Sequence, residues 1–228
     1  MIKISIVLLA ASIIKIIKAT IIDALVVVLT WIVFYRMSLW LFAYFEYNPR
    51  VYWVFLPAGI RMISVFIFSW AGVLGLFIGS VITNEAEISG YVIYLAAISA
   101  ISPMVAKCAC KWWFNIPVTL QGLTGKQLLA FAVSGALSNA LLSNLYFYFA
   151  DRTNSLKGFF PMFVGDLLGT LIIFYLIGKI LKIISLKYKK ITPPYPIKLF
   201  ISIFHYNLRM AAYGPKAPDD IQIKFLQS

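Results

Sequence analysis

Charged residues are scarce in this chain. Only 12% of the 228 residues are charged, against about 25% in an ordinary soluble domain. Hydrophobic residues make up 62% of the sequence, and no stretch is polar enough and long enough to form a separate soluble domain. This composition predicts an all-α integral membrane protein with short loops.

Histidine and cysteine are scarcer still. The only histidine is His205, which excludes haem held by two histidines and histidine-based metal or acid–base sites within one chain. Cys108 and Cys110 have no second cysteine or histidine pair that would complete a metal site. No glycine-rich phosphate loop follows a strand, and no nucleophile stands beside a base. We therefore expect no metal, no cofactor and no enzymatic activity.

Acidic residues are also few, which leaves a strongly basic chain. There are 8 Asp and Glu against 20 Lys and Arg, a formal net charge of +12. In a soluble protein this excess would suggest nucleic acid as a partner. Here the basic residues flank the apolar runs, so membrane topology and anionic lipid explain them better. The lipid bilayer is the expected partner, and nucleic acid is not.

Six apolar runs are the candidate membrane spans. The third is short, and Trp70-Ala71-Gly72 makes the second and third a tight helical hairpin that need not cross fully. Residues 1–20, which include Lys15 and Lys18, form either an amphipathic entry helix on the membrane surface or a short extra span. The predicted membrane domain is 21–186, and its spans are 21–46, 51–69, 71–84, 89–108, 127–150 and 158–185.

The distribution of lysine predicts the orientation. Lys107, Lys111 and Lys126 flank the fourth connection, and further lysines close the sixth span, whereas the loop at 84–87 is acidic. Because cytoplasmic loops carry the excess of Lys and Arg, both termini are expected in the cytoplasm.

A basic cytoplasmic tail, residues 187–228, is expected after the last span. Its prolines at 193, 194 and 196 stop the helix, and 197–210 has the pattern of a helix lying in the headgroup region. This part of the chain would contact either lipid or a partner protein. The candidate contact residues are Lys187, Lys189, Lys190, Lys198 and Arg209.

Two formal charges lie deep inside apolar runs. Arg61 and Asp166 each fall about 12–15 Å below the outer surface if their spans are helical, and Arg36 falls at a similar level. A charge at that depth costs about 3 kcal/mol even on lenient scales. One interpretation is an Arg61–Asp166 ion pair that ties two helices together. The other adds Arg36, Asn139 and Asn144 to form an outward-facing pocket for a small anionic or polar ligand.

Proline and glycine mark further positions. Pro57 and Gly59 predict either a broken helix near Arg61 or a helix that begins late, with proline in its first turn. Small residues at one-turn spacing indicate close helix packing and permit self-association into a homo-oligomer. These pairs are Gly75 with Gly79 and Gly165 with Gly169.

Three short motifs carry a family resemblance: Pro-Ala-Gly at 57–59, a Trp/Gly-rich hairpin at 70–79 and Gly-Asp-x-x-Gly at 165–169. In these residues the chain resembles the MASE-type membrane-associated sensor domain of bacteria, over roughly residues 25–185. The resemblance implies a multi-pass input module of the bacterial inner membrane, usually fused to a histidine kinase or diguanylate cyclase. Arg61 departs from the apolar residue expected there, and no kinase or cyclase follows the last span. The implied protein is a stand-alone module with output through a membrane or cytoplasmic partner.

Three functions compete on this sequence. The first is a membrane sensor or scaffold that binds a ligand or partner and relays this to the cytoplasm. The second is a small-molecule transporter or its substrate-binding subunit, since six spans in about 200 residues is similar to the S components of ECF transporters. Those subunits present small residues in the first span, whereas 24–45 here is bulky. The third, an enzyme using Asp166, lacks a second catalytic carboxylate or histidine.

Overall fold

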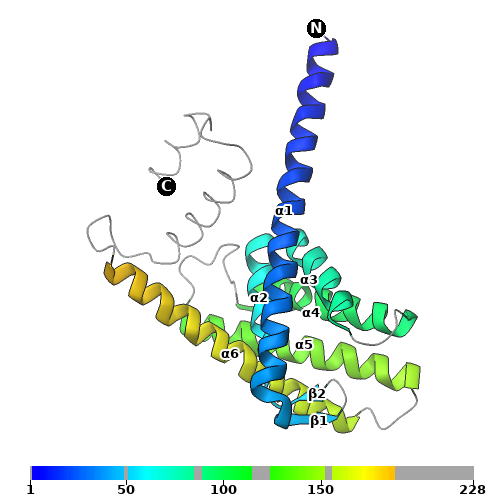
Figure 1. Ribbon diagram of the computed structural model, residues 1–228, viewed down its shortest axis with the longest axis vertical. Helices are drawn as coiled ribbons and strands as arrows, with labels where there is room; N and C mark the ends of the chain where they lie inside the picture. The colour runs from blue at the N-terminus through cyan, green and yellow to red at the C-terminus, as the bar shows by residue number, and fades with distance from the viewer. Residues whose placement is uncertain (1, 49–50, 85–88, 115–123, 152–155, 188–228) are drawn as a thin grey trace.

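The computed structural model describes residues 2–48, 51–84, 89–114, 124–151 and 156–187. Six α-helices make up most of this part of the chain, and a short hairpin of two antiparallel strands follows the first helix (Figure 1). The elements are α1 Ile2–Phe42, the 3₁₀ turn η1 Ala43–Phe45, β1 Glu46–Asn48, β2 Val51–Tyr52, α2 Pro57–Phe68, α3 Trp70–Ile82, α4 Gly90–Phe114, α5 Gly125–Asp151 and α6 Leu156–Lys187.

Four of these helices are long and apolar enough to cross a membrane. They differ from the six predicted spans because α2 and α3 have only 12 and 13 residues, or about 18 and 20 Å of helix against a hydrocarbon core of about 30 Å. The predicted second span begins with extended backbone instead of helix, up to the proline that starts α2. The spanning segments are Ile16–Phe45, Gly90–Phe114, Gly125–Ala150 and Lys157–Ile180.

The first helix is continuous over 41 residues. Residues 2–20 therefore belong to the same helix as most of the predicted span 21–46. No glycine or proline interrupts this stretch, so nothing in the sequence stops the helix. In Figure 1 its N-terminal half extends beyond the other helices.

The short helix α2 is the centre of the bundle. Nine of its 12 residues are buried, and it contacts each of the other five helices. Val65 of α2 packs with Trp31 of α1, Leu76 of α3 and Ala100 of α4, and Met62 and Phe66 pack with Phe131 of α5. Because α2 is surrounded by protein, it is apolar on nearly all sides.

The two predicted glycine pairs contact different kinds of neighbour. A Cβ atom at Gly75 or Gly79 would meet Ala24, Val27 or Trp31 of α1, so this pair packs helix against helix as expected. A Cβ atom at Gly165 or Gly169 of α6 would instead meet the backbone of residues 52–56, which is not helical. Gly165 and Gly169 therefore allow a close approach, as predicted, but the segment that approaches them is not the helix that we expected.

Part of the predicted tail lies outside the described residues. Lys187 is the last residue of α6. Lys189, Lys190, Lys198 and Arg209, and the helix expected at 197–210, fall in the part of the chain that is not described.

Candidate functional site

A segment that is neither helix nor strand, residues 53–56 (here the extended segment), leads from β2 into the centre of the bundle, and its last residue, Leu56, already has helical φ and ψ. Two of its N–H groups are bonded by distant parts of the chain: Phe55 N donates to Gly165 O of α6 at 3.1 Å, and Leu56 N donates to Ser38 Oγ of α1 at 3.3 Å. Pro57 begins α2 in its first turn, where the missing N–H leaves no donor unpaired. Non-helical backbone is tolerated at membrane depth when protein covers it in this way.

Two glycines of α6 make room for this segment. A Cβ atom at Gly165 would strike the carbonyl oxygen of Tyr52, and one at Gly169 would strike that of Phe55. The two glycines are one helical turn apart, so together they form a flat track on α6 along which the extended backbone lies.

Gly59 has a similar packing role and does not break the helix. It lies inside α2, where an added Cβ would come within 2.5 Å of Ile173 Cβ on α6. Of the two interpretations drawn from the sequence, the late-starting helix with Pro57 in its first turn is confirmed.

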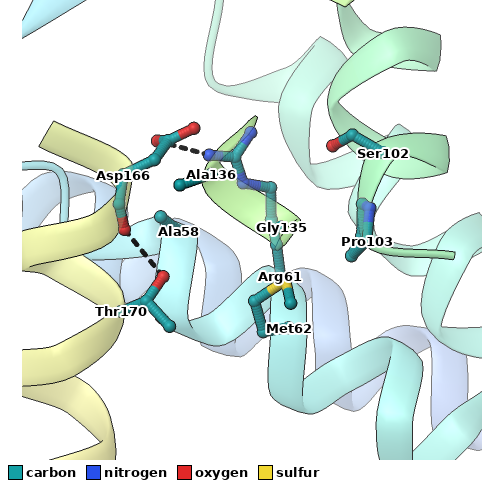
Figure 2. A pocket seen from close by; sticks show the side chains of 9 residues that line it. All are labelled: Ala58, Arg61, Met62, Ser102, Pro103, Gly135, Ala136, Asp166 and Thr170. Atoms are coloured by element: carbon teal, nitrogen blue, oxygen red, sulfur yellow. Dashed lines mark hydrogen bonds and ion pairs between the residues drawn. The ribbon is translucent and has the colours of Figure 1, made fainter. Parts of the chain in front are cut away.

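Arg61 and Asp166 form a buried ion pair. Arg61 Nη2 lies 2.6 Å from Asp166 Oδ1, and the two side chains are 5% and 4% exposed (Figure 2). The second carboxylate oxygen accepts a hydrogen bond from Asn139 Nδ2, also at 2.6 Å. Thr170 Oγ1 donates to the backbone oxygen of Asp166 at 2.7 Å. Both carboxylate oxygens of Asp166 are therefore bonded by the protein itself, as a buried charge requires.

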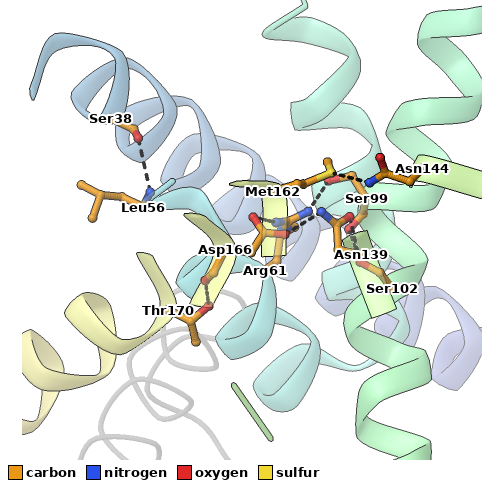
Figure 3. A network of polar contacts seen from close by, with 10 residues as sticks. All are labelled: Ser38, Leu56, Arg61, Ser99, Ser102, Asn139, Asn144, Met162, Asp166 and Thr170. Atoms are coloured by element: carbon orange, nitrogen blue, oxygen red, sulfur yellow. Dashed lines mark hydrogen bonds and ion pairs between the residues drawn. The ribbon is translucent and has the colours of Figure 1, made fainter. Parts of the chain in front are cut away.

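The polar network extends from Arg61 onto α4. Arg61 Nη1 donates to Ser99 Oγ at 3.2 Å (Figure 3). Pro103 in α4 has no N–H to donate to the carbonyl of Ser99 one turn earlier. The hydroxyl of Ser102 lies 3.3 Å from Ser99 O and 3.3 Å from Asn139 Oδ1, and it can donate to either oxygen. The network joins α2, α4, α5 and α6.

A small cavity lies beside the ion pair. Its volume is about 10 Å³, and Arg61, Asp166, Ser102 and Thr170 supply polar groups to its lining (Figure 2). That volume is roughly the minimum for one water molecule, whereas pockets for metabolites measure about 300–1,000 Å³. The site is therefore a polar network closed around its own charges.

Two of the predicted site residues lie outside this network. Arg36 is exposed on α1. Asn144 is buried, but its Nδ2 donates within its own helix to Ala140 O at 2.8 Å and lies 3.7 Å from Met162 Sδ. Its Oδ1 has no hydrogen-bond partner among the described residues. The network around the ion pair thus contains Arg61, Asp166 and Asn139, without the second buried guanidinium group of the pocket interpretation.

Sequence reasoning missed the structural role of Lys107, which it treated only as a marker of orientation. Lys107 Nζ of α4 lies 3.1 Å from Val65 O, 3.5 Å from Phe66 O and 3.1 Å from Ser69 Oγ. It also lies 5.4 Å from the centre of the Phe66 ring. Lys107 is the last residue but one of the predicted span 89–108, so it lacked the depth that singled out Arg61 and Asp166.

Comparison with known proteins gives no relative from which a function could be transferred. No protein-family model, no curated protein and no solved structure matches the chain. The resemblance to the MASE-type sensor domain stays a prediction, and the function is argued from the geometry.

Proposed function

We propose that the chain is a sensor or scaffold module of the bacterial inner membrane, without enzymatic activity, that relays events at its outer end to a protein partner through α6. The observation that carries this proposal is the attachment of the β1–β2 hairpin and α2 to α6. Phe55 N donates to Gly165 O at 3.1 Å. Gly169, four residues further along α6, faces the carbonyl oxygen of Phe55. One residue beyond Gly165, Asp166 holds Arg61.

Because of this attachment, the hairpin and α6 can move only a little relative to each other. Where a glycine faces a carbonyl oxygen, the two backbones are in direct contact, so a displacement of one must displace the other. Both β1 and β2 also contact α6. Because α6 runs for 32 residues, about 48 Å, a shift or rotation at its outer half reaches the opposite side of a bilayer.

The charges support the proposed orientation. The C-terminal end of α4 meets the N-terminal end of α5, where Gln127 Nε2 donates to Phe114 O at 3.4 Å. Lys111 and Lys126 are exposed at this end, and Lys179 and Lys182 are exposed toward the end of α6. A cytoplasmic location for this end follows the positive-inside rule and puts both termini in the cytoplasm.

The closed polar network favours protein contact over ligand transport. A transporter or substrate-binding subunit needs a cavity for its substrate, and the cavity beside Asp166 holds about one water molecule. We therefore favour a partner protein, or a second copy of the chain, over a small ligand in this layer.

The proposal is tested in membranes containing the full chain, with a photo-crosslinking amino acid in place of Ile183, which is 64% exposed near the inner end of α6. We expect one discrete protein adduct. Gly165→Ala, which pushes the extended segment away from α6, should lower its yield several-fold. Gly178→Ala is the matched control, because no described residue lies within 4 Å of a Cβ at Gly178.

The outcomes separate the candidate functions. An adduct that responds to Gly165→Ala but not to Gly178→Ala supports a relay through α6. Crosslinks to lipid alone, or an adduct of equal yield in both variants, would contradict it. A metabolite that co-purifies in stoichiometric amount would favour the transporter instead. Circular dichroism and gel filtration of the purified variants show whether each has folded.

A further inference from the structure

A single residue separates α2 from α3. Ser69 has φ 50° and ψ −118° and is the one non-glycine residue with positive φ in the described part of the chain. Its N–H still bonds back to Val65 O at 3.0 Å, and its carbonyl accepts from Val73 N at 3.1 Å. The two helices therefore meet at a residue whose backbone conformation is unfavourable for every residue except glycine.

An ordinary helical conformation at Ser69 would produce a different molecule. It would merge the 12 residues of α2 and the 13 of α3 into one helix about 39 Å long, enough to cross the hydrocarbon core once. In the folded form α3 instead turns back onto α2, so closely that a Cβ at Gly72 would strike Ser64 O. The two forms differ by one membrane crossing, which reverses the orientation of α4, α5 and α6.

Lys107 of α4 lies at this elbow. Its ammonium group contacts the last carbonyls of α2, at Val65 and Phe66, and the hydroxyl of Ser69 (3.1–3.5 Å). These carbonyls are the negative end of α2, where a cation is favourable. Val65 O already accepts from Ser69 N in the bent form, so the two forms differ at the Phe66 carbonyl. In a continuous helix that carbonyl would also be bonded to the next turn, and the negative end of the helix would no longer lie beside Lys107. Lys107 therefore stabilises the bent form and not the straight one.

We propose that Lys107 fixes the membrane topology of the chain by holding the α2–α3 elbow closed. The test measures on which side of the membrane α4 begins. In a background of Cys108→Ser and Cys110→Ala, Gly90→Cys reports the start of α4 and Tyr47→Cys reports the β1–β2 hairpin. A Cβ at Gly90 meets no described residue within 4 Å, and Tyr47 is exposed. Membrane-impermeant thiol reagents are applied to sealed vesicles of each orientation.

With Lys107 present, the two reporters should be labelled from the same side. Lys107→Met should raise the fraction of chains labelled from opposite sides by about tenfold, since several charge-assisted contacts are lost. Ser69→Gly, which accepts the positive φ, should reverse most of that rise in the double variant. If Lys107→Met leaves both reporters on one side, the proposal is wrong.

A matched control separates the elbow from the charge count. Lys111→Met removes the same charge one turn away on α4, at an exposed position, and should leave both reporters on one side. If Lys111→Met reorients α4 as strongly as Lys107→Met, the positive-inside rule explains the result and the proposal fails. Failure of the Ser69→Gly rescue would overturn it equally. If Lys107→Met is degraded, the labelling of the Lys107→Met/Ser69→Gly double variant decides: both reporters on one side support the proposal, and opposite sides overturn it.

Discussion

Two pairs of glycines with the same spacing support two different structures. Gly75 and Gly79 let α3 approach α1, where an added Cβ would lie 2.6 Å from Ala24 O or 2.8 Å from Trp31 Cδ1. Gly165 and Gly169 let an extended segment lie along α6, where an added Cβ would strike the carbonyl oxygens of Tyr52 and Phe55. The spacing of small residues therefore predicts a close approach but not what approaches.

The difference lies in what can move. At the α1–α3 contact, two regular helices meet, and both can slide by a few tenths of an ångström without losing their own hydrogen bonds. Along α6, the partner is extended backbone whose N–H groups depend on Gly165 O and Ser38 Oγ. Displacing that segment would leave buried backbone groups without partners, which is the costlier failure.

The largest expected effect comes from filling the track on α6. Gly165→Leu should destabilise the fold by more than about 4 kcal/mol, because the side chain meets backbone on a neighbour that cannot withdraw. SDS titration of the purified protein in mixed micelles, followed by circular dichroism, measures this. A loss of under about 1 kcal/mol would show that the extended segment does not lie on α6 in the membrane.

The next effect comes from the ion pair beside that track. Arg61→Met or Asp166→Leu alone should cost about 3 kcal/mol, because each leaves a buried charge without its partner. The double variant should be more stable than either single variant, since no charge is then stranded. The same unfolding titration on the three variants gives the coupling. Additive losses would contradict a direct ion pair and revive a separate role for each residue.

A smaller effect is expected where helix meets helix. Gly75→Ala should cost about 2 kcal/mol, because α1 and α3 must separate slightly to admit one methyl group. The loss should be less than half of that for Gly165→Ala measured in parallel, since the extended segment cannot shift to relieve the contact. Equal losses at the two glycines would remove the distinction between the two contacts.

The sequence predicted much of the fold because the physics is local. Long apolar runs produced α1, which has no internal glycine or proline, and also α4, α5 and α6, which do, and Pro57 correctly marked where α2 could begin. The depth of the charges along the predicted spans also placed Arg61, Asp166 and Asn139 in one polar layer, since buried charges need partners.

The rest depended on contacts between distant parts of the chain. The extended segment at 53–56 is stabilised by Gly165, more than 100 residues away, and Lys107 caps a helix more than 30 residues before it. Arg36 was placed by counting along its own span, which cannot tell which face of α1 it occupies. Its exposure removes the second positive charge on which the pocket interpretation depended.

The smallest effect calibrates the others. Gly178 is on α6, the same helix as Gly165 and Gly169, but a Cβ there meets no atom of the described part of the chain within 4 Å, and the residue is exposed. Gly178→Ala should therefore stabilise the protein by about 0.5 kcal/mol, because alanine restricts the unfolded backbone more than glycine does. The unfolding titration should show a midpoint at or slightly above that of the unmodified chain. A clear loss at Gly178 would mean that α6 is covered there by a neighbour, and the ranking of the glycines by what each one touches would have to be redrawn.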